Sequence, residues 1–269
     1  MEEGFLKTNE FLEYVSKNND RTWVFLDTET LGFTPDKHQL LEIAAEAVTY
    51  NAGTFSHISS FNFKIKLLPI TKIRLSMPYT GSGLSYRDIF KMVNYGQTYK
   101  AGLFIQEKEA LKKLVEYLDS FDDPVIVAHN APFDSNYLSK RHILYFNRTP
   151  FGDYEFLDSL KIMKKYFTPM VLTGSKMRRH KSLPEHKKAN ITLLRKLLSD
   201  LTDKDKIKVS LKLGRVAKAL DINTEYWHSA KYDVKMLISV VEKVIHLFEQ
   251  NKDRNISPTR IVKQKNKKI

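Results

Sequence analysis

The order in which strand-like and helix-like segments follow one another constrains the fold most strongly. Residues 22–27 form a short apolar run, TWVFLD, which is typical of a buried strand. Residues 41–50 and 58–66 are rich in branched and aromatic side chains, and the turn-like residues 51–53 separate them. These segments predict an antiparallel meander of three strands.

Helices and further strands alternate in the next part of the chain. Residues 107–121 carry apolar side chains on one helical face, and residues 125–128 form another buried-strand run. Pro132 suits the first turn of a helix, and a strand at 154–158 precedes a helix at 159–167. This order predicts an α/β fold, in which a mixed five-stranded sheet of antiparallel meander plus parallel strands is flanked by helices.

The rest of the chain divides into helices and basic segments. Apolar periodicity predicts more helices, at residues 9–17, 191–198, 207–220 and 229–249. The lysine- and arginine-rich stretch 176–188 predicts an exposed basic loop. We expect one domain over residues 1–250, with a basic insert near 170–206, and a flexible basic tail at 251–269.

The charge of the chain points to a polyanionic partner. Lys and Arg number 44 against 31 Asp and Glu, which leaves a formal net charge of +13. A surface this positive attracts nucleic acid through the release of counterions. Basic proteins are also common without any specific partner, so the charge alone leaves both interpretations open.

Composition excludes several other classes of protein. The chain has no cysteine, which rules out disulfides, thiolate zinc sites and cysteine nucleophiles. No apolar stretch reaches the roughly 20 residues that span a bilayer, and the N-terminus lacks the apolar core of a signal peptide. We therefore expect a soluble intracellular protein of the cytoplasm, or of the host cytoplasm if it is viral.

Acidic side chains stand at the ends of several predicted elements. Asp27 and Glu29 follow the first strand, and the period of two puts them on one face, about 7 Å apart. Two such carboxylates repel each other unless a cation lies between them, although acids at strand ends are also common in solvated turns. Asp134 opens the helix after VIVAHNAP, and Asp233 opens the last helix five residues after His228.

These acids indicate a metal site when they are taken together. Each has a structural alternative, because an acid in a first turn is stabilised by the helix dipole and a histidine there is often a cap. A mixed sheet would nevertheless gather Asp27, Glu29, Asp134 and Asp233 into one cleft, with His228 at its rim. Four carboxylates suit two Mg²⁺ or Mn²⁺ ions and do not suit zinc.

The three acidic segments are also similar to a known set of motifs. LDTET, HNAPFD and HSAKYD resemble, in order and spacing, the three exonuclease motifs of the DnaQ-like DEDDh family. The resemblance extends over residues 23–247 and includes LDSL at 157–160. It implies a ribonuclease H-like fold and a metal-dependent 3′→5′ exonuclease that releases nucleoside 5′-monophosphates. The chain departs from the family between residues 158 and 207, where it carries the basic insert.

The resemblance implies a role for each acid and for the histidine. Asp27 would bridge both metal ions, while Glu29 and Asp233 would complete the site of the ion that binds the attacking water. Asp134 would help to hold the second ion, and His228 would act as the general base. A sibling branch of the family uses a tyrosine instead, but the spacing of Tyr232 fits that branch less well.

Substrate contacts are expected near the first two motifs. By the same resemblance, Leu31, Gly32, Asn130 and Phe133 would bind the 3′-terminal nucleotide, although Leu31 and Phe133 also suit core packing. The sequence leaves the substrate open between single-stranded DNA, which the basic insert and tail favour, RNA, and proofreading beside a polymerase or repair partner. A catalytically silent binding module remains an alternative, whereas the absence of a G-x-S-x-G turn argues against a serine hydrolase.

Overall fold

The computed structural model describes residues 8–67, 102, 104–164, 202–203, 206–224 and 229–249. Within these residues a six-stranded sheet has the order β4-β3-β2-β1-β5-β6. The middle strand β2 runs antiparallel to both β1 and β3, whereas β5 pairs parallel to β1, β6 to β5 and β4 to β3. The strands are β1 (Thr22–Thr30), β2 (Leu40–Asn51), β3 (Thr54–Ile65), β4 (Phe104–Ile105), β5 (Val125–Ala128) and β6 (Glu155–Asp158).

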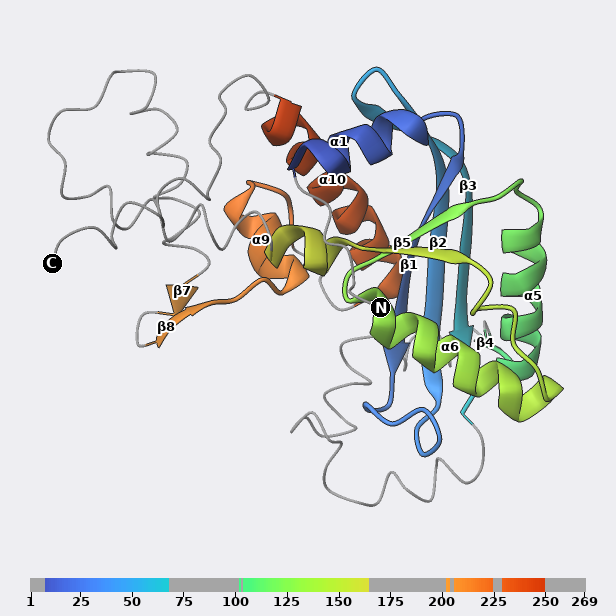
Figure 1. Cartoon of the computed structure of the whole chain (residues 1–269). Helices are drawn as coiled ribbons and strands as arrows, with labels where there is room; N and C mark the ends of the chain where they lie inside the picture. The colour runs from blue at the N-terminus through green and yellow to red at the C-terminus, as the bar shows by residue number, and fades with distance from the viewer. Residues whose placement is uncertain are drawn as a thin grey trace, which may run out of the picture.

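Helices cover both faces of this sheet (Figure 1). The long helix α10 packs on one face together with α1 and α9, and α5 and α6 pack on the other. The helices are α1 (Thr8–Lys17), α5 (Glu107–Asp119), α6 (Ala131–Phe146), α9 (Leu213–Ala219) and α10 (Ala230–Glu249). No helix in the described ranges is long and apolar enough to cross a membrane.

The central strand β1 is apolar on both sides because it lies between these two helix layers. Trp23 and Phe25 belong to the core beneath α10, whereas Val24 and Leu26 belong to the core beneath α5 and α6. A strand buried on both faces reads as a continuous apolar run rather than as an alternation. The period of two continues past the core, so the next odd-numbered residues of β1 point towards the α10 side.

The expected fold class is confirmed, with one strand more than the expected five. The additional strand β4 is two residues long and exists through its pairing with the end of β3. Such a short strand carries no periodicity that a sequence could reveal. The predicted helix at 9–17 is confirmed as α1, and residues 159–164 are helical as expected.

The predicted helix at 207–220 is wrong over its first part. Residues Lys206–Val209 form a strand, β8, which pairs antiparallel with β7 (Thr202–Asp203), and α9 begins only at Leu213. The segment KIKV alternates lysine with branched apolar residues, which is a strand pattern. The predicted basic loop at 176–188, the helix at 191–198 and the C-terminal tail lie outside the described residues, and so does most of the insert near 170–206.

Candidate active site

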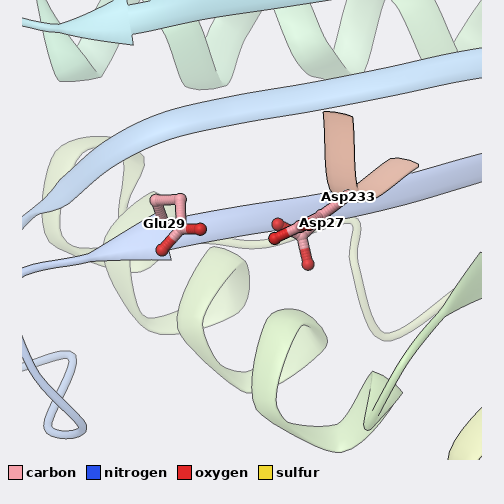
Figure 2. A group of neighbouring side chains, drawn as sticks. All are labelled: Asp27, Glu29 and Asp233. Carbon is pink, nitrogen blue, oxygen red and sulfur yellow. The ribbon is translucent and has the colours of Figure 1, made fainter. Parts of the chain in front are cut away.

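Three acidic side chains from two distant parts of the chain meet at the end of β1. Asp27 and Glu29 come from β1, and Asp233 comes from the first turn of α10. One carboxylate oxygen from each lies within 4.8 Å of those of the other two. Figure 2 shows the side chain of Asp233 reaching from α10 to Asp27, with Glu29 further along the strand.

The packing of α10 against the sheet brings these residues together. Val234 and Leu237 of α10 lie in the same buried cluster as Trp23 and Phe25 of β1. The backbone N–H of Asp233 donates to the carbonyl of Ser229 at 2.9 Å, which places the acid in the first helical turn. An acid in that turn is favoured by the positive end of the helix dipole.

Asp134 lies beside this group without being part of it. It is buried in the first turn of α6, and its Oδ1 accepts two hydrogen bonds from Thr28, from the backbone N–H at 3.1 Å and from Oγ1 at 2.7 Å. Thr28 stands between Asp27 and Glu29 in β1, so these bonds fix α6 to the strand that carries both acids. The role of Asp134 as a metal ligand stays a prediction.

The buried carboxylates of the site repel one another, so a positive charge between them would stabilise their ionised forms. Burial raises the pKa of Asp27 well above its ordinary value, and the charges of Asp134, Glu29 and Asp233 raise it further. Burial and the charges of Asp233 and Glu42 raise the pKa of Glu29 to about 8. Burial likewise raises the pKa of Asp134 to about 7, against the hydrogen bonds from Thr28, which lower it.

A hard divalent cation fits this set of donors. Carboxylate oxygens are the preferred ligands of Mg²⁺, and oxygens on opposite sides of the ion lie roughly 4.2 Å apart. Asp27, Glu29 and Asp233 offer oxygens within 4.8 Å of one another, so one ion placed between them could bind all three, and water would complete its shell. A bound cation would also relieve the repulsion that raises the pKa values of these groups.

The raised pKa values predict how stability depends on pH. The pKa of Glu29 is raised from its ordinary value of 4.5 to about 8, so the folded chain holds this proton more tightly than the unfolded chain. The resulting stabilisation is complete below the ordinary value and is lost as the pH rises through the folded value. We therefore expect the melting temperature in EDTA to fall between about pH 5 and pH 8.

The Glu29→Gln variant supplies the matched control for this effect, because its amide does not ionise. The variant should gain melting temperature over the wild type as the pH rises, and Mg²⁺ or Mn²⁺ should remove most of the difference at pH 8. Thermal unfolding by circular dichroism measures both curves. Parallel curves for the two proteins in EDTA would contradict the assigned repulsion.

A fifth acid, Glu42, adjoins the site and was not predicted from the sequence. It lies in β2 directly opposite Glu29, is fully buried, and accepts hydrogen bonds from Ser229 and Ala230 at the start of α10. Burial raises its pKa, and the nearby charge of Lys64 lowers it. The signal that was available is an acid inside the otherwise apolar strand run LLEIAA.

The predicted substrate residues occupy different environments. Leu31 is 1% exposed, which fits the core-packing alternative. Asn130 is exposed and has a left-handed backbone with φ of 75°, and its N–H donates to Asp158 at 3.0 Å. Phe133 is half-buried and meets Phe33 edge to face, with ring centroids 6.3 Å apart. Phe33 is 60% exposed and is not among the residues that the sequence predicts for substrate binding.

The loop that follows β1 is held tightly by α6. The hydroxyl of Tyr137 donates to the carbonyl of Gly32 at 2.9 Å, and Arg141 donates to that of Pro35 at 3.1 Å. Arg141 is buried and makes a two-pronged ion pair with Glu107 of α5. These contacts fix the loop that exposes Phe33 and indicate a rigid rim beside the acidic group.

His228, the predicted general base, lies outside the described residues, directly before Ser229. Tyr232, one residue before Asp233, is 42% exposed. Neither the role of His228 nor the comparison with the tyrosine branch is tested by these positions.

Known proteins resemble the chain in structure rather than in sequence. No protein-family model matches it, and no curated protein matches it in sequence. An apo structure of exonuclease I has a TM-score of 0.50 and 17% identity, covering 86% of this chain and 44% of that one. A zinc-bound E. coli exonuclease I complex with single-stranded DNA has a TM-score of 0.48 and 16% identity, covering 91% and 43%. Cell-death related nuclease 4 has a TM-score of 0.47 and 11% identity, covering 84% and 64%.

This chain spans less than half the length of the exonuclease I chains that it resembles. At these identities the likeness concerns the fold, and it agrees with the mixed sheet and the two helix layers described above. The chain therefore shares the α/β fold of this exonuclease I structure, a mixed sheet flanked by helices, which agrees with the fold that the sequence motifs imply.

Proposed function

We propose that this chain is a metal-dependent 3′→5′ exonuclease of the DEDDh type, acting on nucleic acid with a free 3′ end. The observation that carries the proposal is the meeting of Asp27, Glu29 and Asp233 at the end of the central strand of a ribonuclease H-like sheet. Their raised pKa values support a site built for divalent cations rather than for structure alone.

The acids would hold two Mg²⁺ or Mn²⁺ ions. Asp27, Glu29 and Asp233 would hold the first, and Asp27 and Asp134 would hold the second. Bound in this way, a pair of divalent ions stabilises charge at both ends of an in-line displacement. The all-carboxylate donors favour Mg²⁺ or Mn²⁺.

The proton chemistry would fall to His228. Its imidazole, with an ordinary pKa of about 6.5, accepts the proton of the attacking water. The new bond forms between that water oxygen and phosphorus, and the bond from phosphorus to the 3′-oxygen breaks. The departing 3′-oxygen takes a proton from water, so the shortened strand ends in a new 3′-hydroxyl and the released product is a nucleoside 5′-monophosphate.

The rim beside the acids would bind the 3′-terminal nucleotide. Gly32 is buried at the start of the loop after β1, and its carbonyl accepts from Tyr137. Asn130 and the aromatic pair of Phe33 and Phe133 adjoin the first and second motifs. An exposed ring supported edge-on by a second ring suits stacking against a nucleobase, which is worth about 1–3 kcal/mol per base.

Replacing Phe33 by alanine is expected to weaken substrate binding. The loss of one stacked base should raise KM roughly 5- to 100-fold with a smaller effect on kcat, because the acids are untouched. Steady-state kinetics on a short oligonucleotide measure both constants. Leu144→Ala is the matched control, since Leu144 is an apolar residue of α6 that is 61% exposed. An unchanged KM for the Phe33 variant would remove this residue from the binding rim.

Single-stranded DNA is the favoured substrate. The net charge of +13 supports a polyanionic substrate, and the basic insert and tail favour a chain that binds a single strand without a partner. Matched DNA and RNA oligonucleotides of the same sequence test this preference, with the released nucleotides identified by chromatography. Deoxynucleoside 5′-monophosphates formed faster than the ribonucleotides support the proposal. Faster release from RNA would make the chain an exoribonuclease, and release from neither would favour a silent binding module.

A further inference from the structure

Glu42 is an acid placed where an apolar residue would be expected. It lies in the middle strand of the antiparallel meander, opposite Glu29 in β1 and opposite Lys64 in β3. Its exposed fraction is 0%. A buried carboxylate is costly unless hydrogen bonds and charges compensate for its lost hydration, so the contacts that surround Glu42 must explain it.

Those contacts lie at the first residues of α10. Ser229 Oγ is 3.3 Å from both carboxylate oxygens of Glu42, and the N–H of Ala230 donates to Oε2 at 3.3 Å. The N–H of Lys231 also hydrogen-bonds to this carboxylate. The first N–H groups of a helix have no partner inside it, and a negative charge there is favoured by the dipole. Glu42 therefore caps α10 from the neighbouring strand.

The capping contacts of Glu42 are linked to the acidic group through Ser229. Ser229, which Glu42 holds, accepts the backbone hydrogen bond of Asp233 at 2.9 Å. The carboxylate of Asp233 in turn approaches Asp27 and Glu29. Glu29 and Glu42 also face each other in the sheet. The contacts of Glu42, Ser229 and the three acids therefore join β1, β2 and the first turn of α10.

Glu42 does not itself belong to the set of possible ligands. Among the described residues, the group of three acids with oxygens within 4.8 Å of one another is Asp27, Glu29 and Asp233, and Asp134 adjoins it through Thr28. Both oxygens of Glu42 face the start of α10. The charge of Glu42 repels that of Glu29, so an acid at this position is unfavourable unless other contacts compensate. The hydrogen bonds to the start of α10 are such contacts.

We infer that Glu42 is a positioning residue, which fixes the first turn of α10 so that Asp233 meets Asp27 and Glu29 in the geometry that a divalent cation requires. This inference rests on the proposed function for the identity of the ligand. Groups that orient metal ligands typically contribute about 10- to 100-fold in metal affinity. Glu42 should therefore affect cation binding more than it affects the fold.

The test measures Mn²⁺ binding to the full chain by electron paramagnetic resonance, without any nucleic acid. Glu42→Leu, which removes the cap, should weaken Mn²⁺ binding about 10- to 100-fold. Glu42→Gln keeps an acceptor oxygen and should recover most of the affinity. Glu46→Leu is the matched control, because Glu46 lies four residues further along β2 on the same face of the strand. It should bind Mn²⁺ as the wild type does.

Thermal unfolding in EDTA accompanies each titration, so that a misfolded variant is recognised. If Glu42→Leu does not fold, Ser229→Ala replaces it, and removal of this one donor should weaken Mn²⁺ binding several-fold. Wild-type Mn²⁺ affinity in the folded Glu42→Leu variant, or in Ser229→Ala where that variant must stand in, overturns the inference.

The outcome is distinguishable from a failure of the proposed function. A wild-type chain that binds Mn²⁺ but cleaves no nucleic acid refutes the exonuclease and leaves the Mn²⁺ affinities to decide the role of Glu42. A wild-type chain that binds no Mn²⁺ overturns both.

Discussion

Replacing Asp27 by alanine is expected to lower the rate of hydrolysis by at least about 10³-fold, because metal-bound stabilisation of a phosphoryl transition state is worth several kcal/mol. Asp27 is the residue that both proposed ions would share. Its pKa, raised by burial and by the charges of Asp134, Glu29 and Asp233, reflects its central place among the acids. Mn²⁺ binding should fall together with activity.

The stability of this variant separates lost chemistry from lost fold. Removing one of several mutually repelling carboxylates should leave the melting temperature in EDTA unchanged or higher at pH 8. Asp20→Ala is the matched control, since Asp20 is an exposed acid in the turn before β1. A folded Asp27→Ala variant that keeps wild-type activity would contradict the assigned site.

Replacing His228 by alanine is expected to lower kcat by about 10²- to 10⁴-fold, the usual contribution of a positioned general base. Because His228 is not a proposed ligand, Mn²⁺ affinity should stay at the wild-type value. Single-turnover cleavage of a labelled oligonucleotide measures the residual rate.

His57→Ala controls for the removal of an imidazole elsewhere, because His57 is exposed on β3 and contacts Ser60. The two predictions also check each other. Asp27→Ala should lose both metal and activity, whereas His228→Ala should lose activity alone. Equal residual activity in both variants would refute the division between metal ligand and general base.

The core strands could be predicted because the sheet is covered on both sides. β1 and β5 are buried throughout their apolar runs, so their sequences carry a strong signal of burial. The alternation of Asp27 and Glu29 on one face follows from the strand period alone. Likewise, the position of Asp233 in the first turn of α10 follows from the helical stripe that begins there.

Features that depend on tertiary pairing could not be predicted in this way. β4 forms only because Phe104 and Ile105 lie beside the end of β3. Where the sequence predicts the start of a helix, the chain instead forms β8, which pairs with β7. The apolar residues there are interrupted by lysines, and this pattern suits either structure. β4 is too short to show a periodicity of its own, and the four residues of β8 are too few to separate a strand from the start of a helix.

The candidate site shows the same division. Acids at the ends of elements could be predicted as a group, because strand and helix ends meet at one edge of such a sheet. The capping contact of Glu42 with α10 joins residues 187 positions apart in the sequence, and the hydrogen bond of Thr28 with Asp134 joins residues 106 apart. The exposure of Phe33 depends on the loop after β1, which Arg141 of α6 holds in place, rather than on the residues next to Phe33 in the sequence.

The placement of the site at β1 has a structural reason. This strand is the junction of the sheet, since it pairs antiparallel with β2 and parallel with β5. Elements from both halves therefore reach its C-terminal end: α6 follows β5, and α10 packs across β1 and β2. A central strand can thus gather acids that are far apart in the chain.

The central claim is tested most directly by one assay, in which a 5′-labelled single-stranded DNA oligomer is incubated with the wild-type chain and Mg²⁺ or Mn²⁺. We predict a ladder that shortens progressively from the 3′ end and that disappears with EDTA. A folded chain that leaves the DNA and the matched RNA intact, or that cuts internally or from the 5′ end, would contradict the proposed 3′→5′ exonuclease.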